Sequence, residues 1–250
     1  MEMRRFSEVD VFAAGPYSGN ALAVVYAAEG LSAEAVQCFA QWTILAETAF
    51  LCSLARPGAD YRVRIFSTSE EPPFAGHPTL GSAAAWLRAD GERRAFSASA
   101  LARYERLDAS TLNTVAATLG VEPDIILGAS WIANGPEWIG VGLASADDVL
   151  ALRPNPADLG TLRIGLIGPP SEGRAEASEV RAFVGGDPVT GSISAGLDRW
   201  LHDGGVVGGG YVAAHRTVVG RRGRANVSYE GGEIWVSGQV TGCVSGEVRL

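Results

Sequence analysis

A single carboxylate interrupts an apolar stretch of this 250-residue chain, in ILAETAFL at residues 44–51. Glu47 is the only charged residue between Glu34 and Arg56. Apolar surroundings disfavour the charged form of a carboxylate and raise its pKa, which suits a group that takes up and returns a proton near neutral pH. A glutamate at the end of a strand, facing solvent, would give the same pattern. Glu47 is therefore either an acid/base group or an ordinary surface residue.

Two further stretches share one spacing, FAGHPTLGSAAAWL at 74–87 and GGDPVTGSISAGLDRWL at 185–201. Setting Pro78 on Pro188 also aligns Gly81 with Gly191, Ser82 with Ser192, Ala85 with Ala195 and Leu87 with Leu197. We predict that each proline lies just ahead of the first turn of a helix that begins with small residues. The first amide groups of a helix lack partners within it and the helix dipole makes that end positive, so each turn could hold a carboxylate. The alternative is a chance likeness between two ordinary turns.

A titratable residue precedes the proline in both stretches, His77 in the first and Asp187 in the second. A lone histidine is often structural, but the place of His77 at a helix entrance favours a functional role. Asp187 could assist it or could simply complement the helix dipole. Ser192 could donate a hydrogen bond to a ligand or pack within its helix. Asn20, which follows Gly19 in the turn GPYSGN, is a turn residue or a substrate contact.

The elements that would position these residues follow from periodicity and turn signals. The predicted helices cover 33–43 (capped by Ser32), 78–90, 108–120 (capped by Asp108 or Ser110), 147–152 and 188–202. The predicted strands cover 4–12, 21–27, 47–52, 61–66, 138–144, 162–168, 179–185 and 246–250, with a hairpin over 224–240 that turns at Gly231-Gly232. Strands outnumber helices, and each half of the chain carries a long central helix.

The second half of the chain repeats the order of the first, which predicts an α+β fold with an internal duplication. Each half is expected to be a mixed or antiparallel sheet wrapped around a central helix. Residues 92–107 are polar and Arg-rich, and we interpret them as a connector that lacks a strand-rich segment. The predicted domains are therefore 1–107 and 108–250, with the last strand able to return to the first domain.

Composition excludes several classes of protein. The net charge is -8 and all 20 basic residues are Arg, so neither a P-loop lysine nor a Schiff-base lysine exists. The acidic balance argues against nucleic-acid binding, and no apolar run is long enough to span a membrane. The MEMRRFSEVDVF start lacks the apolar core of a secretory signal, so we expect a cytoplasmic protein. Neither a disulfide framework nor a metal site is indicated by the remaining candidates, Cys38, Cys52, Cys243, His202 and His215.

Four motifs have the order and spacing of those in a known protein family: VDVFAAGPYSGNALAVV, ILAETAFL, RIFSTSEEPPFAGHPTLGSA and GGDPVTGS. Over residues 8–90 and 183–201 the chain resembles the PhzF-like isomerase family of phenazine biosynthesis. The fold of that family is shared with diaminopimelate epimerase and proline racemase. The resemblance implies two similar α+β domains with an active site between them, a homodimer and no cofactor.

The resemblance also implies roles for particular residues. Glu47 would shuttle the proton, assisted by His77, Asp187 and Ser192. The substrate-binding positions would be Asn20, Gly76, Pro78, Thr79 and Gly191. Racemases of this fold place a cysteine pair at the two helix entrances, where this chain has Gly76-His77-Pro78 and Gly191-Ser192. Two-thiol racemisation is therefore not expected.

The expected activity is that of a cofactor-independent isomerase that moves a double bond and a proton in a small unsaturated carboxylic acid. The resemblance implies a role in bacterial secondary metabolism, such as phenazine or antibiotic assembly. Two alternatives stay open: a racemase or epimerase of an amino-acid-like substrate, and a non-catalytic member that binds a small acid. The expected partner is the small carboxylic acid itself, with neither nucleic acid nor membrane.

Overall fold

The computed structural model of the protein describes residues 1–53, 60–87, 93–97, 103–133, 137–170, 178–184, 191–204, 210–215 and 217–250. The chain divides into two compact units. Unit 1 comprises Met1–Phe96 and Ser237–Leu250, and unit 2 comprises Ser97–Val236, compared with the halves 1–107 and 108–250 predicted from the sequence.

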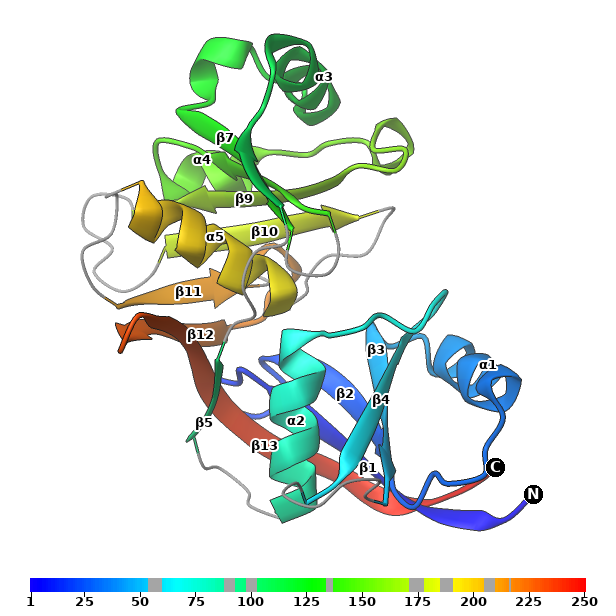
Figure 1. Ribbon diagram of the computed structural model, residues 1–250. Coiled ribbons are helices and arrows are strands. Elements are labelled where there is room, and N and C mark those ends of the chain that lie inside the picture. Colours follow the sequence, from blue (N-terminus) through cyan, green and yellow to red (C-terminus); the bar gives the residue numbers. More distant parts are fainter. Residues whose placement is uncertain are drawn as a thin grey trace. The chain divides into compact units, whose positions relative to one another are not determined.

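Unit 1 is built on a mixed sheet with the strand order β4-β3-β2-β1-β13, and β5 also pairs with β13 (Figure 1). The strands are β1 (Met3–Val11), β2 (Asn20–Val25), β3 (Glu47–Cys52), β4 (Arg62–Ser67), β5 (Arg93–Ser97) and β13 (Glu233–Arg249), and the helices are α1 (Ala33–Thr43) and α2 (Gly76–Leu87). Strands β2 and β3 are parallel, whereas β3–β4, β1–β2 and β1–β13 are antiparallel. The two chain ends lie together, since the amide of Leu250 donates to the carbonyl of Glu2 at 3.0 Å.

Both faces of the unit 1 sheet are covered. On one face, α2 approaches so closely that a Cβ added at Gly81 would lie 2.6 Å from Leu22 Cδ2 and 2.8 Å from Val11 Cγ2. On the other face, α1 packs against a cluster that includes the buried side chains of Val36 and Phe50. The central helix therefore needs a small residue in its second turn, which accounts for the glycine in GHPTLGSA.

Unit 2 contains a second mixed sheet, with the strand order β12-β11-β10-β9-β8-β7-β6. The strands are β6 (Arg103–Arg106), β7 (Gly128–Ala133), β8 (Ile139–Gly142), β9 (Arg163–Gly168), β10 (Ser178–Val184), β11 (Tyr211–His215) and β12 (Gly223–Glu230). The helices are α3 (Ala109–Leu119), α4 (Ala146–Ala151) and α5 (Gly191–Asp203), with short 3-10 turns at Pro123–Ile125, Pro156–Asp158 and Thr217–Val219. Strands β8–β9 and β10–β11 are parallel.

The packing of unit 2 repeats that of unit 1. The long helix α5 lies on one face of the sheet, where Ile193 and Leu197 are fully buried. Helices α3 and α4 cover the opposite face, where Val115 and Val149 join one core cluster. Each unit is thus a mixed sheet with one long helix on one face and shorter helical segments on the other (Figure 1). This confirms the predicted α+β fold of two similar parts.

Several predicted elements are confirmed at the level of their caps and turns. Helix α1 spans 33–43, and Ser32 Oγ accepts a hydrogen bond from the amide of Ala35 at 3.1 Å. Asp108 caps α3 in the same way, through the amide of Thr111 at 2.8 Å. The hairpin β12–β13 turns at Gly231-Gly232, where φ is 62° and 86°. These signals are local, so the sequence alone is enough to find them.

Other expectations were wrong. Residues 92–107 are not a strand-free connector, because β5 and β6 lie within this range. The last strand is not separate: the hairpin strand runs on without interruption as β13, from Glu233 to Arg249. Strands β7 and β11 were not predicted. Strand β5 pairs with β13, which is distant in sequence, whereas β7 and β11 pair with the next strands along the chain, β8 and β12. Cross-strand hydrogen bonding, both long-range and local, therefore overrides weak local propensity.

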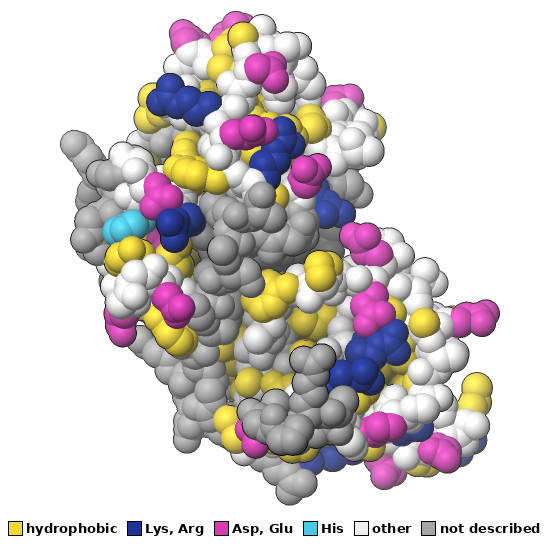
Figure 2. Space-filling model, viewed as in Figure 1, with side chains coloured by type: hydrophobic (Ala, Val, Ile, Leu, Met, Phe, Trp, Pro, Cys, Tyr) yellow, Lys and Arg dark blue, Asp and Glu magenta, His cyan; other side chains and the backbone are white. Residues whose placement is uncertain are grey.

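Acidic and basic side chains are interspersed on the face of both units seen in Figure 2. Several form short ion pairs, such as Arg64–Glu71 at 2.7 Å and Arg199–Asp203 at 2.9 Å. Exposed pairs of this kind contribute little to stability. On this face, charges of opposite sign therefore lie next to each other and do not form separate acidic and basic patches.

Candidate active site

Glu47 is the first residue of β3, and a tight reversal after α1 places it there. Helix α1 ends at Thr43, and Ile44 caps it in the left-handed region with φ 57°, while its amide donates to the carbonyl of Gln41. A β-branched residue rarely adopts this conformation. Glu47 then pairs with Ser67 of β4 and is only 5% exposed. Its side chain is therefore inside the unit rather than in bulk solvent.

His77 lies in the first turn of α2 and is fully buried. Its Nδ1 is 3.3 Å from Oε2 of Glu47. The structure therefore brings together the carboxylate and the imidazole that the sequence singled out separately. A buried carboxylate in contact with an imidazole can exchange a proton with it, and each group can orient the other.

Helix α2 begins at Gly76, two residues earlier than predicted. Pro78 lies inside the first turn rather than ahead of it. The amides of the first turn have no acceptor within the helix, so a proline there costs no hydrogen bond. The consequence is that His77 belongs to the helix and projects from its positive end.

Asn20 is the first residue of β2 and is 4% exposed. Strands β2 and β3 are parallel, with Ala23 opposite Thr48, so Asn20 and Glu47 lie toward the same edge of the sheet. Among the described residues, the buried Nδ2 of Asn20 has no hydrogen-bond partner. A buried amide donor in this state is available to a polar ligand.

The turn before Asn20 is fixed by Asp10. The buried carboxylate of Asp10 accepts a hydrogen bond from the amide of Gly19 at 3.0 Å. The sequence analysis did not single out Asp10, since it reads as one position of an alternating strand. A signal in the sequence could have identified it: Asp10 lies near the end of β1, and the Gly19-Asn20 turn that follows leads directly into the antiparallel strand β2.

The remaining predicted residues of α2 are placed as follows. Gly76 and Pro78 are buried in the first turn, beside His77. The Thr79 hydroxyl donates to the carbonyl of Ala75 at 2.8 Å, as does its amide at 3.2 Å. In this conformation the hydroxyl of Thr79 bonds back to the carbonyl four residues earlier in the chain.

In unit 2, helix α5 runs from Gly191 to Asp203, compared with the predicted range 188–202. Residues 185–190, which contain the second proline-led turn, lie outside the described residues. Asp187 lies outside the described residues, and the side chain of Ser192 is likewise not described. The roles of Asp187, Gly191 and Ser192 therefore stay predictions.

A buried carboxylate that the sequence analysis missed lies on α5. Asp198 is 4% exposed, and burial raises its pKa to about 7. Burial also raises the pKa of Tyr211 on β11, and the charge of Asp198 adds to this. Asp198 adjoins the buried Leu197, so a helical-wheel reading of GLDRWL could have identified it.

The pKa of Asp198 makes a prediction about stability. Because its pKa is raised in the folded state, the folded protein is most favoured below the unfolded pKa of about 4 and loses stability as the pH rises through about 7. The variant Asp198→Asn has no carboxyl group to ionise at this position, so it avoids this loss of stability. We expect its stabilising effect to be about 2 kcal/mol larger at pH 8 than at pH 4.5, measured by urea denaturation. Asp124→Asn, at an exposed aspartate, is the control and should show no such difference.

The described part of the chain has neither a membrane-spanning helix nor a metal-binding cluster. No helix there is long and apolar enough to cross a membrane. Among the same residues, no group of three or more His, Cys, Asp or Glu side chains could hold a metal ion.

Comparison with known proteins places the chain in a family. The family model for phenazine biosynthesis-like proteins, PhzC-PhzF, matches residues 9–99. A protein of Pseudomonas aeruginosa named uncharacterized isomerase PA3578 is 32% identical over 210 residues, which cover 77% of this chain and 79% of that protein. The chain therefore belongs to the PhzF family.

A more specifically named relative is the trans-2,3-dihydro-3-hydroxyanthranilate isomerase of Pseudomonas fluorescens. It is 31% identical over 173 residues, which cover 61% of this chain and 62% of the relative. Other curated relatives match over as little as 26% of their own length. The chain thus spans less than two thirds of the length of these relatives.

The fold comparison reaches further along the chain. A PhzF-family protein of Bacillus anthracis covers 100% of both chains with a TM-score of 0.82 at 19% sequence identity. At this identity the likeness shows the shared fold. It confirms the fold that the resemblance implied.

Proposed function

We propose that this chain is a cofactor-independent isomerase that moves a proton, and with it a double bond, in a small unsaturated carboxylic acid. The observation that carries the proposal is the buried contact of 3.3 Å between Oε2 of Glu47 and Nδ1 of His77 at the start of α2. It gives one carboxylate an imidazole partner inside unit 1, which is the minimum needed for a reversible proton transfer.

The chemistry follows from this arrangement. Glu47 removes a proton from a carbon next to an unsaturated group and returns it to the conjugated position. His77 orients the carboxylate and exchanges a proton with it. The first turn of α2 places the positive end of a helix dipole beside the pair, which stabilises a substrate carboxylate and the negative charge that develops on it. The buried donor of Asn20 is suited to hold a polar group of the same substrate.

The names of two relatives support a choice of substrate class. Proteins named trans-2,3-dihydro-3-hydroxyanthranilate isomerase share 31–32% identity with this chain over 173 residues. We include in the proposal a cyclic, unsaturated amino acid of this kind as substrate and a place in phenazine-type or antibiotic metabolism. The proposal also includes a cytoplasmic homodimer, as the resemblance implies.

The direct test is to incubate the purified protein with trans-2,3-dihydro-3-hydroxyanthranilate in D₂O and follow the ring protons by NMR. We expect loss of the starting olefinic signals and incorporation of deuterium at the carbon that receives the proton. Consumption and labelling no faster than in a protein-free control would contradict the proposal for this substrate.

A further inference from the structure

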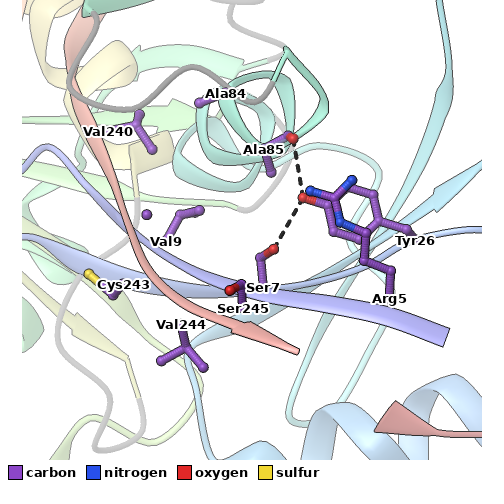
Figure 3. A pocket seen from close by; sticks show the side chains of 11 residues that line it. Arg5, Ser7, Val9, Tyr26, Ala84, Ala85, Val240, Cys243, Val244 and Ser245 are labelled. Atoms are coloured by element: carbon purple, nitrogen blue, oxygen red, sulfur yellow. Dashed lines mark hydrogen bonds between the residues drawn. The ribbon is translucent and has the colours of Figure 1, made fainter. Parts of the chain in front are cut away.

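A pocket of about 230 Å³ opens on unit 1 beside the C-terminal half of α2, whereas His77 lies in the first turn of that helix (Figure 3). Neither His77 nor Glu47 lines it. Its apolar wall is formed by Val9 of β1, Val240 of β13 and the α2 residues Ala84 and Ala85. All of its lining residues belong to unit 1.

An irregularity in the sheet shapes this pocket. In the β1–β13 pairing, Glu8 is opposite Val244 and Val9 is opposite Gly242, so Cys243 has no partner in β1. Such a β-bulge twists the strand and turns side chains away from their regular alternation. The Cys243 side chain lines the pocket. The floor of the pocket is therefore built by the bulge.

One end of the pocket is polar and held in place by several contacts. The guanidinium of Arg5 lies 4.3 Å from the centre of the Tyr26 ring. The Tyr26 hydroxyl donates to the carbonyl of Ala85 at 3.1 Å and is 3.3 Å from Oγ of the buried Ser7 (Figure 3). Arg5 and Ser7 lie on the same face of β1, two residues apart. The ring of Tyr26 thus supports a cation at the edge of the pocket.

The charge at this end is not balanced locally. No acidic residue lines the pocket. Glu247 is opposite Arg5 in the sheet register, but the Arg5 side chain lies over Tyr26 instead. Within the described part of the chain, no ion pair to Arg5 is formed. A guanidinium in this state is a strong donor for a carboxylate.

We infer that this pocket is a second small-molecule site, which binds a compact organic carboxylate. The anionic end pairs with Arg5 and accepts from the hydroxyl group of Ser245, and the apolar end lies against Val9 and Ala84. The volume of about 230 Å³ is several times the ~30 Å³ of one water molecule and smaller than the ~300 Å³ at which drug-sized pockets begin. It therefore suits a molecule with a single ring.

Cys243 provides a built-in reporter of occupancy. Cys38 is exposed and Cys52 is buried, so a full-length Cys38→Ser protein leaves Cys243 as the partly accessible thiol. Burial raises the pKa of the Cys243 thiol, and the charge of Asp10 raises it further, so iodoacetamide labelling should be slow and best measured at alkaline pH. Benzoate is the probe, and benzamide is its uncharged counterpart. We expect saturating benzoate to slow labelling of Cys243 about tenfold and benzamide to have little effect.

Variants separate this site from the candidate active site. Arg5→Gln and Ser245→Asp, both at exposed residues, should abolish the protection by benzoate. Arg62→Gln, at an exposed arginine that does not line the pocket, should keep it. Glu47→Gln should also keep it. Equal protection by benzoate and benzamide, protection that survives Arg5→Gln, or no protection by benzoate in the Cys38→Ser protein would each overturn the inference.

Discussion

The variant Glu47→Gln is expected to lose double-bond migration while it keeps the fold. The amide is nearly isosteric with the carboxylate and can retain a contact with Nδ1 of His77, now 3.3 Å from Oε2. It cannot accept the substrate proton. We expect kcat to fall by about 10³-fold or more, since general acid/base catalysis contributes factors of this size. The measurement is deuterium incorporation from D₂O into trans-2,3-dihydro-3-hydroxyanthranilate, followed by NMR.

The exposed residue Glu34 provides a control for this variant. Glu34→Gln makes the same chemical change at an exposed position in the first turn of α1 and should leave the rate within about twofold of wild type. Equal label incorporation by the Glu47→Gln protein and the wild type would remove Glu47 from the mechanism. A loss of label together with a collapsed denaturation midpoint would instead indicate a structural role.

Much of the local structure could be predicted because its causes are local. Ser32 and Asp108 cap helices with their own side chains, and Gly231-Gly232 supply the positive φ angles of the hairpin. Glu47 was found as a candidate because it is the only charge in a long apolar stretch. The sequence left open whether this side chain faces solvent, because a strand end can be buried or exposed; in the structure it is only 5% exposed.

The features that the sequence does not predict depend on contacts between residues that are distant along the chain. The contact between Glu47 and His77 exists because α2 packs tightly on the sheet, and that packing needs the missing side chain of Gly81. The sequence shows neither the contact nor its distance. Strand β13 likewise contains glycines that read as breaks, yet pairing with β1 carries the strand through them and absorbs Cys243 as a bulge. Local propensity gives no account of such pairing.

The second large effect is expected for Gly19→Ala, at the turn that delivers Asn20 to the sheet edge. A Cβ at Gly19 would lie 2.2 Å from the carbonyl oxygen of Val11 and 2.9 Å from the amide nitrogen of Ala13. Both are backbone atoms, so no side-chain rotation relieves the clash. The turn must open, and the hydrogen bond from the Gly19 amide to Asp10 is lost with it. We expect the free energy of unfolding to fall by about 3 kcal/mol, as measured by urea denaturation.

The same turn supplies the matched control, since a Cβ at Gly15 would meet no atom within 4 Å. Gly15→Ala should change stability by no more than about 1 kcal/mol and can even stabilise the fold by restricting the unfolded chain. If both alanine variants unfold at the wild-type urea concentration, the close approach at Gly19 is not a constraint. A second outcome is that Gly19→Ala alone is destabilised and that its folded molecules convert substrate more slowly than the wild type. In that case the geometry of this turn is needed for Asn20 to act. Asn20 would then belong to the substrate site by position, because its own side chain is unchanged in that variant.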